Sequence, residues 1–190
     1  MESSTAVDND QPSSMQQSTS TSPSSTAAPP RTIDLVICNV CKVSNIRSLL
    51  LSAAAFGCRA VYVVGQKRSL ILPEDDETTN VPLPVLQQQQ LKIHRFDTWD
   101  DCTEYLKLNR IHLIGIEIDE RSKCLNDDYD MLSNSIALMA GNEGQGIHPK
   151  HLKDCDEIVR IPQYGVGTAS FNVTVATTMV LSSFHYHNKK

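Results

Sequence analysis

The chain has 190 residues and carries 17 Lys and Arg against 22 Asp and Glu, a formal net charge of −5. Strong autonomous binding to nucleic acid is disfavoured by this balance, because nucleic-acid-binding proteins usually present a basic face. No apolar stretch approaches the roughly 20 residues that span a bilayer, so we expect no membrane-spanning segment.

Residues 1–31 differ in composition from the rest of the chain. They are rich in Ser, Thr, Pro and Gln, and they reach Arg31 before any other basic residue while carrying three acids. A mitochondrial presequence would hold several arginines and few acids, and a secretion signal would need an apolar core. We therefore predict a disordered tail over 1–31, one folded domain over 32–190, and a cytoplasmic or nuclear rather than secreted protein.

The first half of the predicted domain reads as a βαβ unit. Residues 33–38 (IDLVIC) and 60–64 (AVYVV) are short apolar runs, typical of strands that are buried on both faces of a parallel sheet. The apolar spacing between them predicts a helix, with Ser44 as its N-cap and Gly57 at its C-terminal end.

The second half continues the alternation of strands and helices. Residues 69–84 hold an acidic run and prolines, which indicates an exposed connection, and Thr98 is expected to cap a helix that ends at Asn109. Further strands are expected at 91–96, 111–118, 135–140 and 157–161. The pattern predicts an α/β fold, with a mostly parallel sheet flanked by helices and with ligands bound beyond the carboxyl ends of the strands.

A glycine turn, GNEGQG, follows the apolar run 135–140. Gly141, Gly144 and Gly146 permit positive φ and close approach of another group to the backbone. Their spacing is G-x-x-G-x-G, and no phosphate-binding lysine follows, which argues against a Rossmann or P-loop site. A purely structural turn is the alternative for this loop on its own. A second glycine-bearing loop, from Gly165 to Asn172, follows the next strand, and two such loops can enclose one ligand.

Two cysteines, Cys38 and Cys41, form a C-x-x-C pair at the end of the first predicted strand. No second pair and no histidine cluster follows at zinc spacing, so we predict reduced thiols and no metal, with a metal or redox pair as the alternative.

Three blocks of the sequence resemble the signature motifs of a known family. They are NVCKVSNIRSLLLSAAAFG at 39–57, the run 135–140 with its glycine turn, and IPQYGVGTASFNVTVA at 161–176. These resemble the SpoU branch of the SPOUT methyltransferases, which transfer a methyl group from S-adenosylmethionine to a ribose 2′-hydroxyl in RNA.

The resemblance implies several properties of the chain. It implies S-adenosyl-L-methionine as cofactor, structured RNA (tRNA or rRNA) rather than DNA as partner, a homodimer, and a C-terminal deep trefoil knot, a feature that is very rare among folds. It also makes residues 173–184 a helix, whereas their β-branched side chains on their own favour a strand.

The resemblance also assigns site residues. The cofactor would be contacted, mainly through backbone groups, by Ala140, Gly141, Gly146, Ile161, Ser170 and Phe171, and the catalytic positions are Asn45, Arg47, Glu143 and Asn172. The first motif of the family usually reads N-x-G, with an arginine six residues after the asparagine. Here Arg47 stands at the glycine position and Leu51 at the arginine position.

That departure leaves alternatives open. Arg47 either replaces the missing arginine from one turn away on the same helix face, or is a surface residue. In the second case the chain is a non-catalytic RNA- or cofactor-binding module. A nucleotide-binding hydrolase is a third hypothesis, and the missing phosphate-binding lysine and metal carboxylates argue against it.

Overall fold

The computed structural model describes residues 32–65, 91–125, 135–165 and 170–187. The predicted disordered tail (1–31), the predicted connection (69–84) and Gly167 lie outside the described residues.

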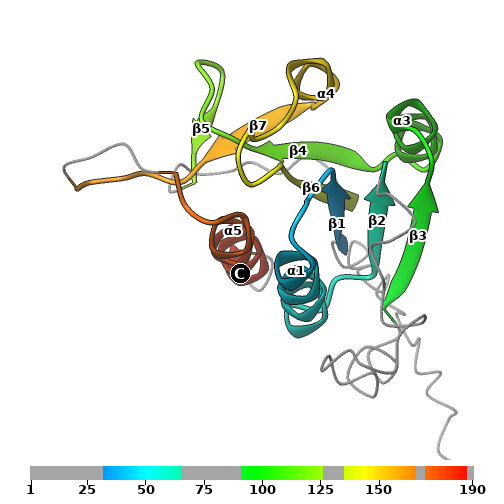
Figure 1. Ribbon diagram of the computed structural model, residues 1–190, viewed down its shortest axis with the longest axis horizontal. Coiled ribbons are helices and arrows are strands. Elements are labelled where there is room, and N and C mark those ends of the chain that lie inside the picture. The colour runs from blue at the N-terminus through cyan, green and yellow to red at the C-terminus, as the bar shows by residue number, and fades with distance from the viewer. Residues whose placement is uncertain (1–31, 66–90, 126–134, 166–169, 188–190) are drawn as a thin grey trace, which may run out of the picture.

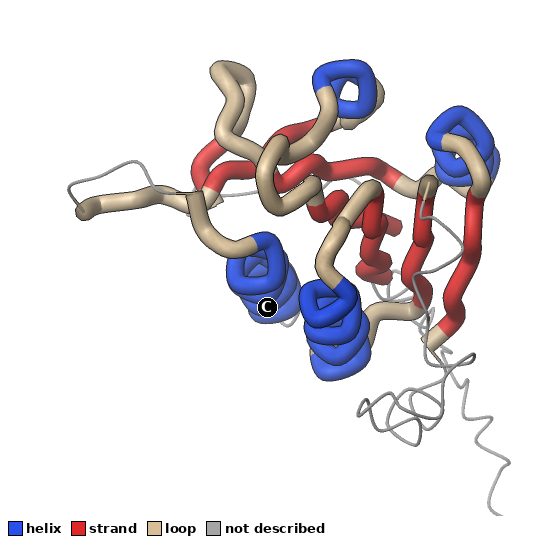
Figure 2. Tube along the Cα trace, viewed as in Figure 1, coloured by secondary structure: helices blue, strands red, loops and turns tan. Residues whose placement is uncertain are grey.

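The described strands form one parallel sheet (Figures 1 and 2). Its order is β3-β2-β1-β6-β4-β7-β5, and every strand pairing in it is parallel. The strands are β1 (Thr32–Cys38), β2 (Ala60–Val64), β3 (Lys92–Phe96), β4 (His112–Ile116), β5 (Lys123–Cys124), β6 (Ser135–Ala140) and β7 (Glu157–Arg160). The predicted parallel α/β sheet is confirmed. The two-residue strand β5 was not predicted, because it is too short to show a period.

Helices cover both faces of the sheet. Figure 1 shows α1 (Val43–Ala55) and α5 (Val173–His187) side by side on one face, with α3 (Trp99–Leu108) and α4 (Pro149–Lys153) on the other. Each face has its own core of buried side chains. Leu49 and Leu181 belong to the core under α1 and α5, and Trp99 and Leu152 to the core under α3 and α4. Among the described residues, no helix has the length and apolar character needed to cross a membrane.

The predicted helix ends are confirmed at Gly57 and Thr98 but not at Ser44. Gly57 has φ +68° and follows α1, with the N–H of Cys58 bonded to the carbonyl of Ala53, as predicted for a glycine C-terminal end. Thr98 caps α3 by accepting from the N–H of Asp101, also as predicted. The prediction that Ser44 caps α1 is wrong: the helix begins at Val43.

The C-terminal segment is a helix, as the resemblance implied and as local propensity did not. Helix α5 packs along α1, and Val180, Leu181 and Phe184 are buried between it and the sheet. Burial against the sheet and α1 outweighs the modest cost of β-branched residues in a helix. The trefoil knot stays a prediction, because the connections from β5 to β6 and from β7 to α5 include residues 126–134 and 166–169, which are not described.

Candidate functional site

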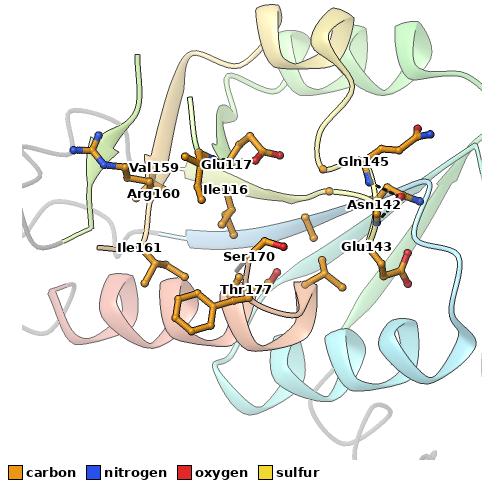
Figure 3. A pocket seen from close by; sticks show the side chains of 18 of the residues that line it. Ile116, Glu117, Asn142, Glu143, Gln145, Val159, Arg160, Ile161, Ser170 and Thr177 are labelled. Atoms are coloured by element: carbon orange, nitrogen blue, oxygen red, sulfur yellow. Dashed lines mark hydrogen bonds between the residues drawn. The ribbon is translucent and has the colours of Figure 1, made fainter. Parts of the chain in front are cut away.

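A cavity of about 310 Å³ lies at the carboxyl ends of three neighbouring strands, β4, β6 and β7 (Figure 3). Its remaining wall comes from the start of α5 and the residues just before it. All six predicted cofactor-binding residues line this cavity: Ala140, Gly141, Gly146, Ile161, Ser170 and Phe171. The structure therefore brings together residues from two motifs that are separated in the sequence.

The glycine turn is closed by its own hydrogen bonds. The N–H of Asn142 donates to the carbonyl of Gly146 at 2.9 Å, and the N–H of Gly146 donates back at 3.0 Å. The side-chain oxygen of Asn142 accepts from the N–H groups of Gly144 and Gln145, and its Nδ2 donates to the carbonyl of Asn39. The turn is thus rigidly closed and tied to the loop that follows β1.

The glycines of the turn serve different purposes. Gly146 has φ +67°, a conformation that other residues rarely adopt. A Cβ on Gly141 would lie 2.6 Å from the carbonyl carbon of Gly146, so Gly141 lets the two ends of the turn touch. A Cβ on Gly144 would meet nothing closer than 3.7 Å. The close approach expected at Gly141 is therefore to the backbone of the turn itself.

Glu143 belongs to the glycine turn, and its carboxylate contacts the start of α1. Its carboxylate accepts from the N–H groups of Cys41 (2.9 Å) and Lys42 (2.8 Å) and from Nδ2 of Asn45 (2.8 Å). Partial burial acts to raise the pKa of Glu143, but these hydrogen bonds outweigh it and lower the pKa to about 2. Glu143 is therefore ionised at neutral pH, and its carboxylate accepts three hydrogen bonds from the residues at the start of α1.

Asn45 links Glu143 to Asn172. The Nδ2 of Asn172 lies 3.4 Å from Oδ1 of Asn45, and the Oδ1 of Asn172 accepts from the N–H of Thr174, capping α5. Three of the four predicted catalytic residues, Asn45, Glu143 and Asn172, thus form one network that joins the glycine turn to the first turns of α1 and α5.

Arg47 does not belong to this network. It lies on α1 two residues after Asn45, and it is not among the described residues that line the cavity. Its Nε is buried without a hydrogen-bond partner in the described part of the chain, and Leu51, at the arginine position of the family, is 37% exposed.

Several polar residues of the cavity were not predicted as site residues: Glu117, Asn142, Gln145, Arg160, Gln163 and Thr177. Glu117 lies just past β4 and lines the cavity, but the predicted strand 111–118 included it, so its place at the end of a strand was not visible in the sequence. Thr177 of α5 also lines it and is 1% exposed. Nothing in the run VTVATTMV distinguishes this threonine from its neighbours.

The C-x-x-C pair is split between two environments. Cys38 is buried, and this burial raises its pKa to about 11, whereas Cys41 is exposed; both are free thiols. In the described segments, no group of three or more His, Cys, Asp or Glu side chains is arranged to hold a metal ion.

Comparison with known proteins identifies the family of the chain. The profile of the SpoU rRNA Methylase family matches residues 32–182. A 23S rRNA (guanosine-2′-O-)-methyltransferase RlmB from Xanthomonas campestris is 27% identical over 158 residues, which cover 82% of this chain and 59% of that protein. An uncharacterized tRNA/rRNA methyltransferase of Mycolicibacterium paratuberculosis is 28% identical over 148 residues, which cover 76% of this chain and 44% of that protein. The chain spans about half the length of these curated relatives.

A solved structure has the same fold. The SpoU methyltransferase AviRb from Streptomyces viridochromogenes, in complex with the cofactor AdoMet, superposes with a TM-score of 0.68 at 22% identity, covering 86% of this chain and 60% of that one. With a profile that matches from the first strand into the last helix, the chain belongs to the SpoU rRNA Methylase family.

Proposed function

We propose that this chain is an S-adenosylmethionine-dependent methyltransferase that acts on the ribose 2′-hydroxyl of a structured RNA, tRNA or rRNA. The observation that carries the proposal is the convergence of all six cofactor candidates on one cavity, with the network of Glu143, Asn45 and Asn172 at its edge.

The lining of the cavity suits S-adenosylmethionine. Its volume falls in the range of small-molecule sites, roughly 300–1,000 Å³. Side chains of Ile116, Val159 and Ile161 offer an apolar wall for a purine, and the strand ends offer backbone N–H and carbonyl groups. The carboxylate of Glu143 offers negative charge near a cofactor that carries a sulfonium cation.

The bound cofactor supplies an activated methyl group, so the protein must mainly orient a hydroxyl and stabilise its developing negative charge. Glu143 holds the start of α1, and through Asn45 it fixes the amide of Asn172 beside the cavity. This places two amide side chains where a ribose could be hydrogen-bonded. Arg47, a cation on α1 two residues after Asn45, is the proposed group for stabilising the alkoxide.

The choice of the ribose 2′-oxygen rests on the motif resemblance and on a relative. The Xanthomonas protein is described as a guanosine-2′-O methyltransferase, and it matches most of this chain. For the RNA, the proposal extends to the class, a structured tRNA or rRNA.

We also propose that the chain forms a homodimer through α5. A groove on this helix is lined by Phe56, Leu125, Val175, Met179 and Tyr186, and three of these side chains, Val175, Met179 and Tyr186, are exposed to 41–62%. A second copy of the chain would remove this apolar surface from water. The groove lies close to the first turn of α5, which also borders the cavity, so dimerisation would place a second subunit near the site.

A second candidate function is a non-catalytic module that binds RNA or cofactor. It is favoured by Leu51 at the arginine position and by the absence of Arg47 from the described lining of the cavity. Calorimetry with S-adenosylmethionine, followed by transfer assays on total tRNA and rRNA with mapping of ribose methyl groups, separates the two. Binding with transfer supports the enzyme, and binding without transfer supports the module.

A further inference from the structure

We propose that Glu117 is a positioning residue, whose carboxylate holds the glycine turn in the shape that receives the cofactor. This inference deepens the proposed cofactor site and rests on the proposed function.

Glu117 connects β4 to the far end of the glycine turn. Its own N–H donates to the carbonyl of Val159 at 3.0 Å, which extends the sheet pairing one residue beyond β4. One carboxylate oxygen, Oε1, accepts from the N–H of Ile118 at 2.9 Å, and the other, Oε2, accepts from the N–H of Ile147 at 2.8 Å. The carboxylate therefore bridges two backbone segments that are 30 residues apart in the sequence.

The same carboxylate fills the space beside Gly146. A Cβ on Gly146 would lie 2.2 Å from Oε2 of Glu117 and 3.0 Å from its Cδ. Position 146 therefore requires glycine for two reasons. Its φ is positive, and the carboxylate of Glu117 packs where a Cβ would lie. Glu117 and Gly146 are complementary in shape, and each limits what the other position accepts.

The turn is consequently held from two sides by two carboxylates. Glu143 ties it to the start of α1, and Glu117 ties its other end to β4. Ile147 is buried, so removal of the Glu117 carboxylate would leave a backbone N–H there without its acceptor. The contacts of Glu143 would remain. The expected consequence is a displaced turn at the cavity wall, with α1 and its network intact.

The test compares wild-type protein with Glu117→Ala and Glu117→Gln, and with Glu120→Gln as a matched control. Glu120 is exposed and lies in the same loop. The dissociation constant for S-adenosylmethionine is measured by calorimetry, with folding checked by circular dichroism. Glu117→Ala should weaken binding about tenfold or more, a cost typical of a buried donor left without an acceptor. The affinity of Glu117→Gln should lie between those of wild type and Glu117→Ala, since its single amide oxygen can replace only one of the two carboxylate acceptors. Glu120→Gln should bind like wild type.

Kinetics and a double-mutant cycle separate positioning from a general loss of structure. Glu117→Ala should raise the KM for the cofactor while leaving kcat at saturating cofactor nearly unchanged. Gly146→Ala should weaken binding less in the Glu117→Ala background than in the wild type, because backbone strain is the same in both and only the clash with the carboxylate is relieved.

The outcomes are distinct. If Glu117→Ala and Glu117→Gln both bind S-adenosylmethionine as tightly as wild type, the inference is overturned and the proposed function stands. An equal cost of Gly146→Ala in the two backgrounds would also overturn it. A folded wild-type protein that binds no S-adenosylmethionine would overturn the proposed function and this inference together. If Glu117→Ala does not fold, Glu117→Gln and its partial loss carry the test.

Discussion

The side-chain amide of Asn45 donates a 2.8 Å hydrogen bond to the carboxylate of Glu143, which lies 98 residues further along the chain. This contact joins the first turn of α1 to the glycine turn after β6. It means that the geometry of the proposed ribose site depends on the geometry of the proposed cofactor site, because one carboxylate serves both.

The pH dependence of stability should report on Glu143. Its pKa is lowered from 4.5 to about 2, so its ionised form is favoured by folding. This contribution is fully present above pH 4.5 and is lost as the pH falls toward 2. Denaturant unfolding between pH 6 and pH 2 should show a smaller decline for Glu143→Gln than for wild type. The same decline in both proteins would exclude this role for the carboxylate.

Asn172 should separate a stability role from a catalytic role. Asn172→Ala removes the cap of α5 and should lower the free energy of unfolding by about 1 kcal/mol. Asn172→Asp keeps an acceptor for the N–H of Thr174 but cannot donate to Asn45, so it should retain stability and lose methyl transfer. Thermal melts and transfer assays on both variants check this. Methyl transfer by Asn172→Asp at the wild-type rate would show that the side-chain amide of Asn172 is not needed for catalysis.

Gly141→Val should abolish binding of S-adenosylmethionine. The added side chain meets the backbone of Gly146 at 2.6 Å, so the two ends of the glycine turn must separate. Gly144→Ala is the matched control, because its Cβ meets nothing closer than 3.7 Å. Calorimetry should show no binding for the first and nearly unchanged binding for the second. Equal affinities would mean that closure of the turn does not shape the site.

The homodimer should depend on the apolar groove of α5. Met179→Glu places a charge in the groove and should give a monomer in light scattering at micromolar concentration. Leu108→Glu is the control, since Leu108 is 77% exposed on α3, on the opposite face of the sheet. A wild-type monomer, or a dimer that tolerates Met179→Glu, would show that this surface has another use.

The sequence was sufficient to predict most of the fold and many of the residues that line the candidate site. Apolar runs predict β1, β2 and β6 well because strands buried on both faces need such residues throughout. The convergence of Gly141 and Phe171 on one cavity could be expected because the carboxyl ends of parallel strands meet at one edge of a sheet.

Long-range contacts explain what the sequence could not predict. Ser44 is a plausible local cap, but the backbone N–H groups just before α1 donate to the carboxylate of Glu143, which is distant in the sequence. Glu117 was missed for the same reason, since its partner Ile147 is known only once β4 and the glycine turn are adjacent. Helix α5 could be predicted only from its packing against α1 or from the family resemblance, because its β-branched residues favour a strand.

Methyl transfer from labelled S-adenosylmethionine to total tRNA and rRNA, with the modified position mapped, tests the proposed function directly. Wild-type protein should place methyl groups on ribose 2′-oxygens. Arg47→Ala should lower the rate on the order of 100-fold or more with nearly unchanged cofactor affinity, as is typical for loss of a group that stabilises developing charge. Full activity of Arg47→Ala would assign that role to another residue. A folded wild-type protein that binds the cofactor but methylates no RNA, with transfer restored by Leu51→Arg, would contradict the proposed methyltransferase activity and support the non-catalytic module.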